Sequence, residues 1–173
     1  MNLYFIVLRL IHILCGVAWA GTTFFMVSTL IPAARAAGPE AGRFLGRMAG
    51  SNRMLVFIGV SNTLTVISGI LLYGALTSGF KLDWLSSGRG MVLTIGALAG
   101  LLAWVIGAIG MGPTGKRVAN LIEAMQSVGG PPAPDQMAAL QSLREKQGQY
   151  GSWLAVLLAI AVVGMSIAEY LTF

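Results

Sequence analysis

The sequence predicts an all-α integral membrane protein, built as a four-helix bundle in a single transmembrane domain that covers residues 1–173. Its composition is the first reason: 56% of the 173 residues are hydrophobic and only 10% are charged, whereas soluble domains carry about 25% charged residues. The mean hydropathy of +0.79 agrees with this composition. The second reason is four apolar runs, each long enough for the roughly 20 helical residues that cross a bilayer.

The predicted spans cover about residues 3–31, 54–76, 91–112 and 150–173. Each break between them carries Pro, Gly or charged residues, which end membrane helices. The first run is too long for the apolar part of a signal peptide, and no Lys or Arg precedes it. We therefore expect it to be a spanning anchor.

The cations predict the orientation of the chain. The loops at 32–53 and 113–149 carry eight cations, namely Arg35, Arg43, Arg47, Arg53, Lys116, Arg117, Arg144 and Lys146. The opposite side carries Lys81 and Arg89, together with Arg9 if its side chain reaches outward. Because Lys and Arg concentrate in cytoplasmic loops, we expect both loops inside and both termini outside. The net charge of +5 then needs no nucleic-acid partner.

The second cytoplasmic loop predicts a short amphipathic helical hairpin. After an expected turn at 111–115, apolar residues recur at helical spacing, from Val118 to Met125. The Gly- and Pro-rich stretch at 129–132 ends this helix, and Asp135 can cap a second one. The two helices could lie on the membrane, extend the spans or dock a partner.

Three ionisable side chains lie inside the predicted spans, and each is a candidate site because charge and imidazole are costly in hydrocarbon. Arg9 and His12 share one face of the first helix, and Trp19 continues it. Counted from the outer ends at about 1.5 Å per residue, Glu169 matches the depth of Arg9. Met165 matches the depth of His12. We expect a structural ion pair between Arg9 and Glu169, with His12 beside Met165.

The single histidine limits what this site can bind. It excludes bis-histidine heme ligation within one chain and any multi-histidine zinc site. It permits a His/Met heme, a five-coordinate tetrapyrrole, or a site that a second copy or another subunit completes. Copper(I) held by His12 and the thioether of Met165 is an alternative. His12 could also simply bond a hydroxyl such as that of Ser68 or Thr94.

The first span resembles a known family signature. Residues 9–21 read Arg-Leu-Ile-His-Ile-Leu-Cys-Gly-Val-Ala-Trp-Ala-Gly, which fits R-x-x-H-x-x-x-G-x-x-W-x-G. This pattern resembles the opening of the copper-resistance protein D-like membrane families. It is also similar to the start of the membrane-bound, heme-associated protoporphyrinogen oxidases and to the membrane part of certain urate oxidases. Residues 65–73 resemble the second span of these families, and 164–170 are similar to the fourth span of an uncharacterised four-helix branch.

The resemblance implies a helical bundle in a bacterial plasma membrane, with His12 as the ligand of a heme or metal. Heme b or another tetrapyrrole would lie among His12, Trp19 and Met165, and Arg9 could meet a propionate. The chain has no second histidine and no lysine within a span, which argues against oxidase activity, so no catalytic residue is expected.

Three functions follow from these observations. The first is a tetrapyrrole-binding, redox-linked membrane protein. The second is a non-catalytic accessory subunit that packs against a larger membrane complex, or against copies of itself, through small-residue helix faces. The third is a copper-handling protein or transporter. In all three the lipid bilayer surrounds the chain.

Overall fold

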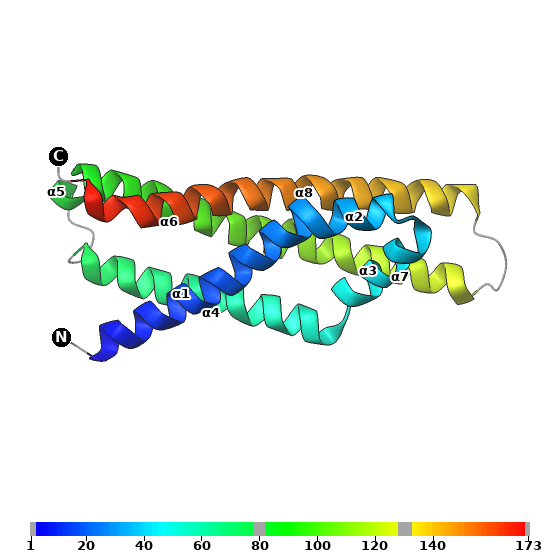
Figure 1. The fold of residues 1–173 in the computed structure, drawn as a ribbon, viewed down its shortest axis with the longest axis horizontal. Helices are drawn as coiled ribbons and strands as arrows, with labels where there is room; N and C mark the ends of the chain where they lie inside the picture. Colours follow the sequence, from blue (N-terminus) through cyan, green and yellow to red (C-terminus); the bar gives the residue numbers. More distant parts are fainter. Residues whose placement is uncertain (1–2, 78–81, 128–132, 172–173) are drawn as a thin grey trace.

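The computed structural model describes residues 3–77, 82–127 and 133–171, and these are almost entirely helical (Figure 1). No strand occurs within these ranges, so the all-α prediction is confirmed there. The elements are α1 (Leu3–Phe25), η1 (Met26–Leu30), α2 (Ile31–Ala36), α3 (Pro39–Ala49), α4 (Asn52–Leu76), α5 (Leu82–Leu85), α6 (Gly88–Ile106), η2 (Gly107–Met111), α7 (Gly112–Ser127), α8 (Pro134–Ile167) and η3 (Ala168–Tyr170).

Four continuous helical stretches are long and apolar enough to cross a membrane: Leu3–Ala36, Asn52–Leu76, Gly88–Ser127 and Pro134–Tyr170. They contain the first three predicted spans and the fourth as far as Tyr170, and they fit a multi-pass membrane protein. The start of α1, the short α5 and the end of α8 lie at one end of the molecule, which we call the terminal end (Figure 1). The opposite end holds α2, α3, α7 and the start of α8 (Figure 1). We call it the basic end, because α2, α3, α7 and the first half of α8 carry seven of the eight cations of the two long loops, all except Arg53 of α4. Lys81 lies outside the described residues.

Two of the four stretches continue through a proline that was expected to end them. Pro32 and Pro113 each lack an N–H, and a proline ring clashes with the carbonyl four residues earlier in an α-helix. Two residues before each proline a π-helical turn ends, η1 in the first stretch and η2 in the third. In a π turn each backbone hydrogen bond joins an N–H to the carbonyl five residues earlier, as from Gly112 N–H to the Gly107 carbonyl, instead of four residues earlier as in an α-helix. This wider turn leaves room for the ring, so the expected turn at 111–115 is wrong and this segment is helical.

The predicted hairpin at the basic end is present, but it is not separate from the spans. Its first arm is α7, which continues α6, and its second arm is the beginning of α8. The two arms pack against each other. Of the three placements left open, extension of the spans is the one that the structure shows. The predicted loop at 113–149 is therefore mostly helix, and its Gly- and Pro-rich part at 129–132 lies outside the described residues.

The predicted loop at 32–53 also holds a helix, α3, that sequence analysis did not predict. Gly38 precedes it with a φ of +95°, a left-handed conformation that favours glycine. Pro39 opens the helix, where its missing N–H costs nothing. Glu40 in the first turn and Arg47 in the last turn match the helix dipole. These signals were in the sequence, within a segment interpreted only as a connection.

The long helices pair as two antiparallel hairpins, α1 with α4 and α6 with α8. The second pair is joined where the backbones approach directly. A Cβ atom added to Gly164 would lie 3.2 Å from both the Gly96 Cα and the Val92 carbonyl oxygen. A Cβ atom added to Gly96 would lie 3.3 Å from the Ala161 carbonyl oxygen. Small residues let membrane helices gain this contact where no hydrophobic force acts between them.

Trp19 of α1 connects the two hairpins. Its side chain is only 4% exposed, and it belongs to a buried cluster with Ala20, Ala103 of α6, and Leu154 and Leu158 of α8. α1 starts beside α4 and crosses toward α8 along its length, as Figure 1 shows. A single large aromatic side chain therefore fills the space where three helices from both hairpins meet.

Replacement of Gly164 by Ala should lower the free energy of unfolding by about 1–3 kcal/mol, because the added methyl group meets backbone atoms that cannot rotate away. Gly59→Ala on α4 is the matched control, since nothing lies within 4 Å of its added Cβ atom. The control should be neutral or stabilising, because Ala favours a helix over Gly. Unfolding followed by circular dichroism in one detergent measures both variants. Equal effects would contradict the direct backbone contact.

Candidate functional site

The side chain of His12, on α1, packs against α4. The Nδ1 atom lies 2.8 Å from the backbone carbonyl oxygen of Thr65 and 3.4 Å from Ser68 Oγ. A Cβ atom on Gly69 would lie 2.8 Å from the His12 Cε1 atom. The imidazole therefore fits against α4 only because residue 69 has no side chain.

These contacts define the tautomer of the neutral imidazole. A carbonyl oxygen can only accept, so Nδ1 carries the hydrogen and donates it to Thr65. The Ser68 hydroxyl uses its own hydrogen on the Leu64 carbonyl, 2.5 Å away. In the neutral ring Nε2 therefore carries no hydrogen, and within the described residues no hydrogen bond reaches this atom. A histidine whose one nitrogen donates to a backbone carbonyl is oriented as metal-ligating histidines are.

Arg9 and Glu169 meet at the terminal end, where the expected ion pair was placed. Arg9 Nη2 lies 3.9 Å from Glu169 Oε2, which joins α1 to η3. The two side chains are 69% and 66% exposed in the isolated chain. An exposed pair of this kind contributes little stability. The Arg9 guanidinium, one helical turn from His12, therefore stays accessible to a further anionic group.

The side chains of Met165 and Trp19 pack in helix interfaces other than the one that holds His12. Met165 packs into the interface between α6 and α8, where its Cγ atom lies 3.4 Å from the position of a Cβ atom on Gly96. His12 packs into the interface between α1 and α4, and no hydrogen bond of the described residues joins it to Met165. Their expected contact stays a prediction. Trp19 fills the buried cluster between the hairpins.

The polar residues of α4 mostly satisfy their own helix. The hydroxyl of Thr65 donates to the Ser61 carbonyl at 2.7 Å. One bond that sequence analysis missed crosses between helices: Tyr73 of α4 lies 2.5 Å, hydroxyl to hydroxyl, from Thr94 of α6. Thr94, which was considered as a partner for His12, is therefore used elsewhere. The one signal in the sequence for this contact is that Tyr73 and Thr94 lie at similar distances from the terminal ends of their two spans.

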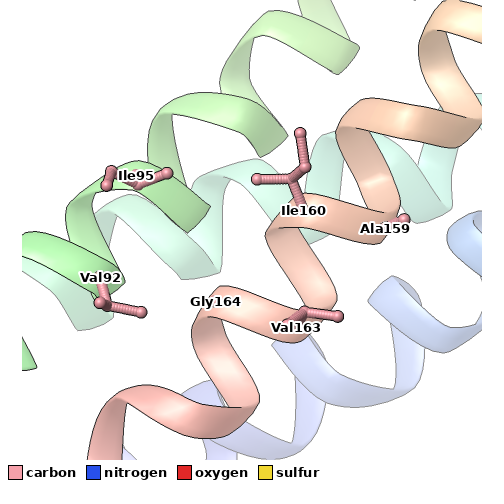
Figure 2. Close-up of a pocket in the computed structure, with 6 residues that line it drawn as sticks. All are labelled: Val92, Ile95, Ala159, Ile160, Val163 and Gly164. Carbon is pink, nitrogen blue, oxygen red and sulfur yellow. The ribbon is translucent and has the colours of Figure 1, made fainter. Parts of the chain in front are cut away.

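Two surface hollows of the described residues bear on where a ligand could bind. A groove of about 340 Å³ between α6 and α8 is lined by aliphatic side chains and Gly164, as Figure 2 shows. It offers no ligand atom to a metal and contains none of the expected site residues. The second hollow, of about 640 Å³, lies at the basic end. The described residues hold no cluster of three or more His, Cys, Asp or Glu suited to a metal ion.

Comparison of the chain with protein-family models, with curated proteins and with solved structures finds no match. The resemblance of the first span to known membrane families therefore stays a prediction. The fold defines the chain as an all-α protein with four helices able to span a membrane. Any function must be argued from its own residues.

The tautomer of His12 can be tested directly because the chain has only one histidine. Long-range ¹⁵N–¹H correlation spectra of detergent-solubilised protein at neutral pH should show a protonated Nδ1 and an unprotonated Nε2. In Gly69→Ala the added methyl group would displace the ring, and this pattern should change. Gly74→Ala, whose added Cβ atom meets nothing within 4 Å, is the control on the same helix and should leave it unchanged. A protonated Nε2 in the unaltered protein would contradict the assignment.

Proposed function

We propose that the chain is a multi-pass plasma-membrane protein that binds heme b or another tetrapyrrole through Nε2 of His12, in a redox-linked role. The observation that carries this proposal is the hydrogen bond from Nδ1 of His12 to the Thr65 carbonyl, 2.8 Å long. It fixes the ring and leaves one nitrogen lone pair available. A polar side chain held in this way at membrane depth is a functional candidate by default.

Arg9 supports the same proposal. It lies one turn closer to the terminal end than His12, and its exposed guanidinium is only loosely paired with Glu169. Guanidinium groups bind carboxylates in a bidentate manner, so Arg9 suits a propionate. When bound, the tetrapyrrole would supply a one-electron redox centre. The protein would supply one axial nitrogen, the orientation of that nitrogen and a cation for the propionate.

The orientation that we propose places the basic end in the cytoplasm. Seven of the eight cations of the two long loops lie on α2, α3, α7 and the first half of α8, and the eighth, Arg53, is at the start of α4. The positive-inside rule then places both termini, and with them the His12 site, toward the outer face. A redox centre at this depth would face the outer half of the membrane.

Purified protein should show a Soret band that is lost in His12→Ala. Ser68→Ala is the matched control, because it removes the weaker neighbour of Nδ1 and keeps the Thr65 carbonyl. The control should keep the band. Gly69→Ala, which displaces the ring without removing it, should weaken the band, and added imidazole should restore it in His12→Gly. A colourless protein after reconstitution with heme, or a band that survives in His12→Ala, would refute tetrapyrrole binding at this site.

A second candidate, the accessory subunit or homo-oligomer, is favoured by the low burial of the spans. In three of the four stretches only 17% of the most apolar window is buried inside the chain. α1 and α4 expose much of their apolar surface, which leaves faces for another membrane helix. The copper-handling alternative gains less support, because His12 and Met165 pack in different helix interfaces.

This second candidate predicts a complex of fixed composition. Protein isolated in a mild detergent should give a native mass above the 18.1 kDa of one chain, either as a multiple of it or with a second protein at constant ratio. Native mass spectrometry measures this directly. A single chain with no bound protein over a range of detergents would exclude the accessory role.

A further inference from the structure

The hollow at the basic end is bordered by arginines from two different helices. It has a volume of about 640 Å³ and lies between Arg35 of α2 and the first three turns of α8, which contribute Arg144. Arg35 reaches across α8, because its Nη2 atom lies 3.8 Å from the position of a Cβ atom on Gly148. Arg144 is four residues before Gly148 and so lies on the same face of α8. Arg35 and Arg144 therefore both line one hollow.

Neither arginine forms an ion pair with a carboxylate of the described residues. The one acid in the lining, Glu145, accepts a hydrogen bond from the Gln141 amide at 3.1 Å. The ion pairs of the described residues join Arg9 to Glu169 and Arg43 to Glu40, and neither includes Arg35 or Arg144. The lining therefore carries two cations against one carboxylate, an excess of one positive charge. This excess favours a bound anion.

The shape and depth of the hollow indicate which anion. Leu140, which is buried, and Met137 give it an apolar part beside the cationic rim. Arg144 lies six residues before Tyr150, where the predicted span begins. At a rise of about 1.5 Å per residue this is about 9 Å from the hydrocarbon, near the level of lipid headgroups. A headgroup phosphate can meet the arginines there while its acyl chains stay in the membrane.

We propose that Arg35 and Arg144 form a binding site for the phosphate of an anionic phospholipid headgroup. Guanidinium groups bind phosphate oxygens in a bidentate manner, and basic pockets beside membrane helices bind such headgroups. The site uses no residue of the His12 region, so it stands independently of the proposed tetrapyrrole. It fixes the end of α2 against α8 when a lipid is bound.

Native mass spectrometry of the full chain in detergent, titrated with phosphatidylglycerol, tests the site. The double variant R35Q/R144Q should bind this lipid about tenfold or more weakly than the unaltered protein, since each arginine near the surface contributes severalfold. The matched control is K116Q/R117Q, which removes two cations of α7 at the same end and outside the hollow. The control should retain most of the affinity. Phosphatidylcholine should bind weakly to all three proteins.

The source of the phosphate is distinguished by a parallel titration with inorganic phosphate, followed by thermal unfolding. Stabilisation by phosphatidylglycerol that is lost in R35Q/R144Q supports the lipid site. If inorganic phosphate stabilises the protein but phosphatidylglycerol neither binds in native mass spectrometry nor stabilises it, the lipid assignment is overturned. Equal losses in R35Q/R144Q and K116Q/R117Q would overturn the site itself, because they would show only general attraction between the basic end and anionic lipid.

Discussion

The close approach of helix backbones at glycine is the constraint on which the rest of this structure depends. In hydrocarbon the helices satisfy their own backbone groups, and no hydrophobic force brings one helix to another. Association must therefore come from direct packing. At Gly96 and Gly164 the backbones of α6 and α8 meet so closely that an added Cβ atom would lie only 3.2–3.3 Å from backbone atoms of the other helix. Trp19 then fills the space between this hairpin and the other.

The same rule creates the candidate site. In the interface between α1 and α4, the missing side chain of Gly69 leaves room for the edge of the His12 ring, whose Cε1 atom would lie 2.8 Å from an added Cβ atom. A polar ring in such an interface needs a partner, because an unsatisfied polar group in an apolar environment is costly. The Thr65 carbonyl supplies that partner for Nδ1. The contact with Gly69 and the hydrogen bond to Thr65 therefore fix the ring. Nε2 is then the ring nitrogen that could bind a ligand.

Sequence reasoning succeeded where regular helix geometry carries the information. The four spans follow from apolar length, and the meeting of Arg9 with Glu169 at 3.9 Å follows from counting equal rises along two helices. It failed where the rotation of one helix against another decides. The shortest hydrogen bond of His12 goes to the Thr65 carbonyl at 2.8 Å, which was not predicted, while the expected Ser68 hydroxyl is the longer contact at 3.4 Å. Pro113 was expected to end the third span, but the π turn at η2 lets the helix continue past it. No residue type alone predicts such a turn.

The two ends of the molecule differ in how their charges are compensated. At the terminal end Arg9 already has Glu169 within ion-pair distance. At the basic end Arg35 and Arg144 border a hollow whose one acidic residue is bonded to Gln141. The positive-inside rule explains on which side of the membrane the cations lie. It does not specify the direction in which their side chains extend. Arg35 of α2 and Arg144 of α8 line the same hollow, and Arg35 packs against α8 at Gly148, which has no side chain. Membrane orientation alone does not require two cations from separate helices to line one hollow.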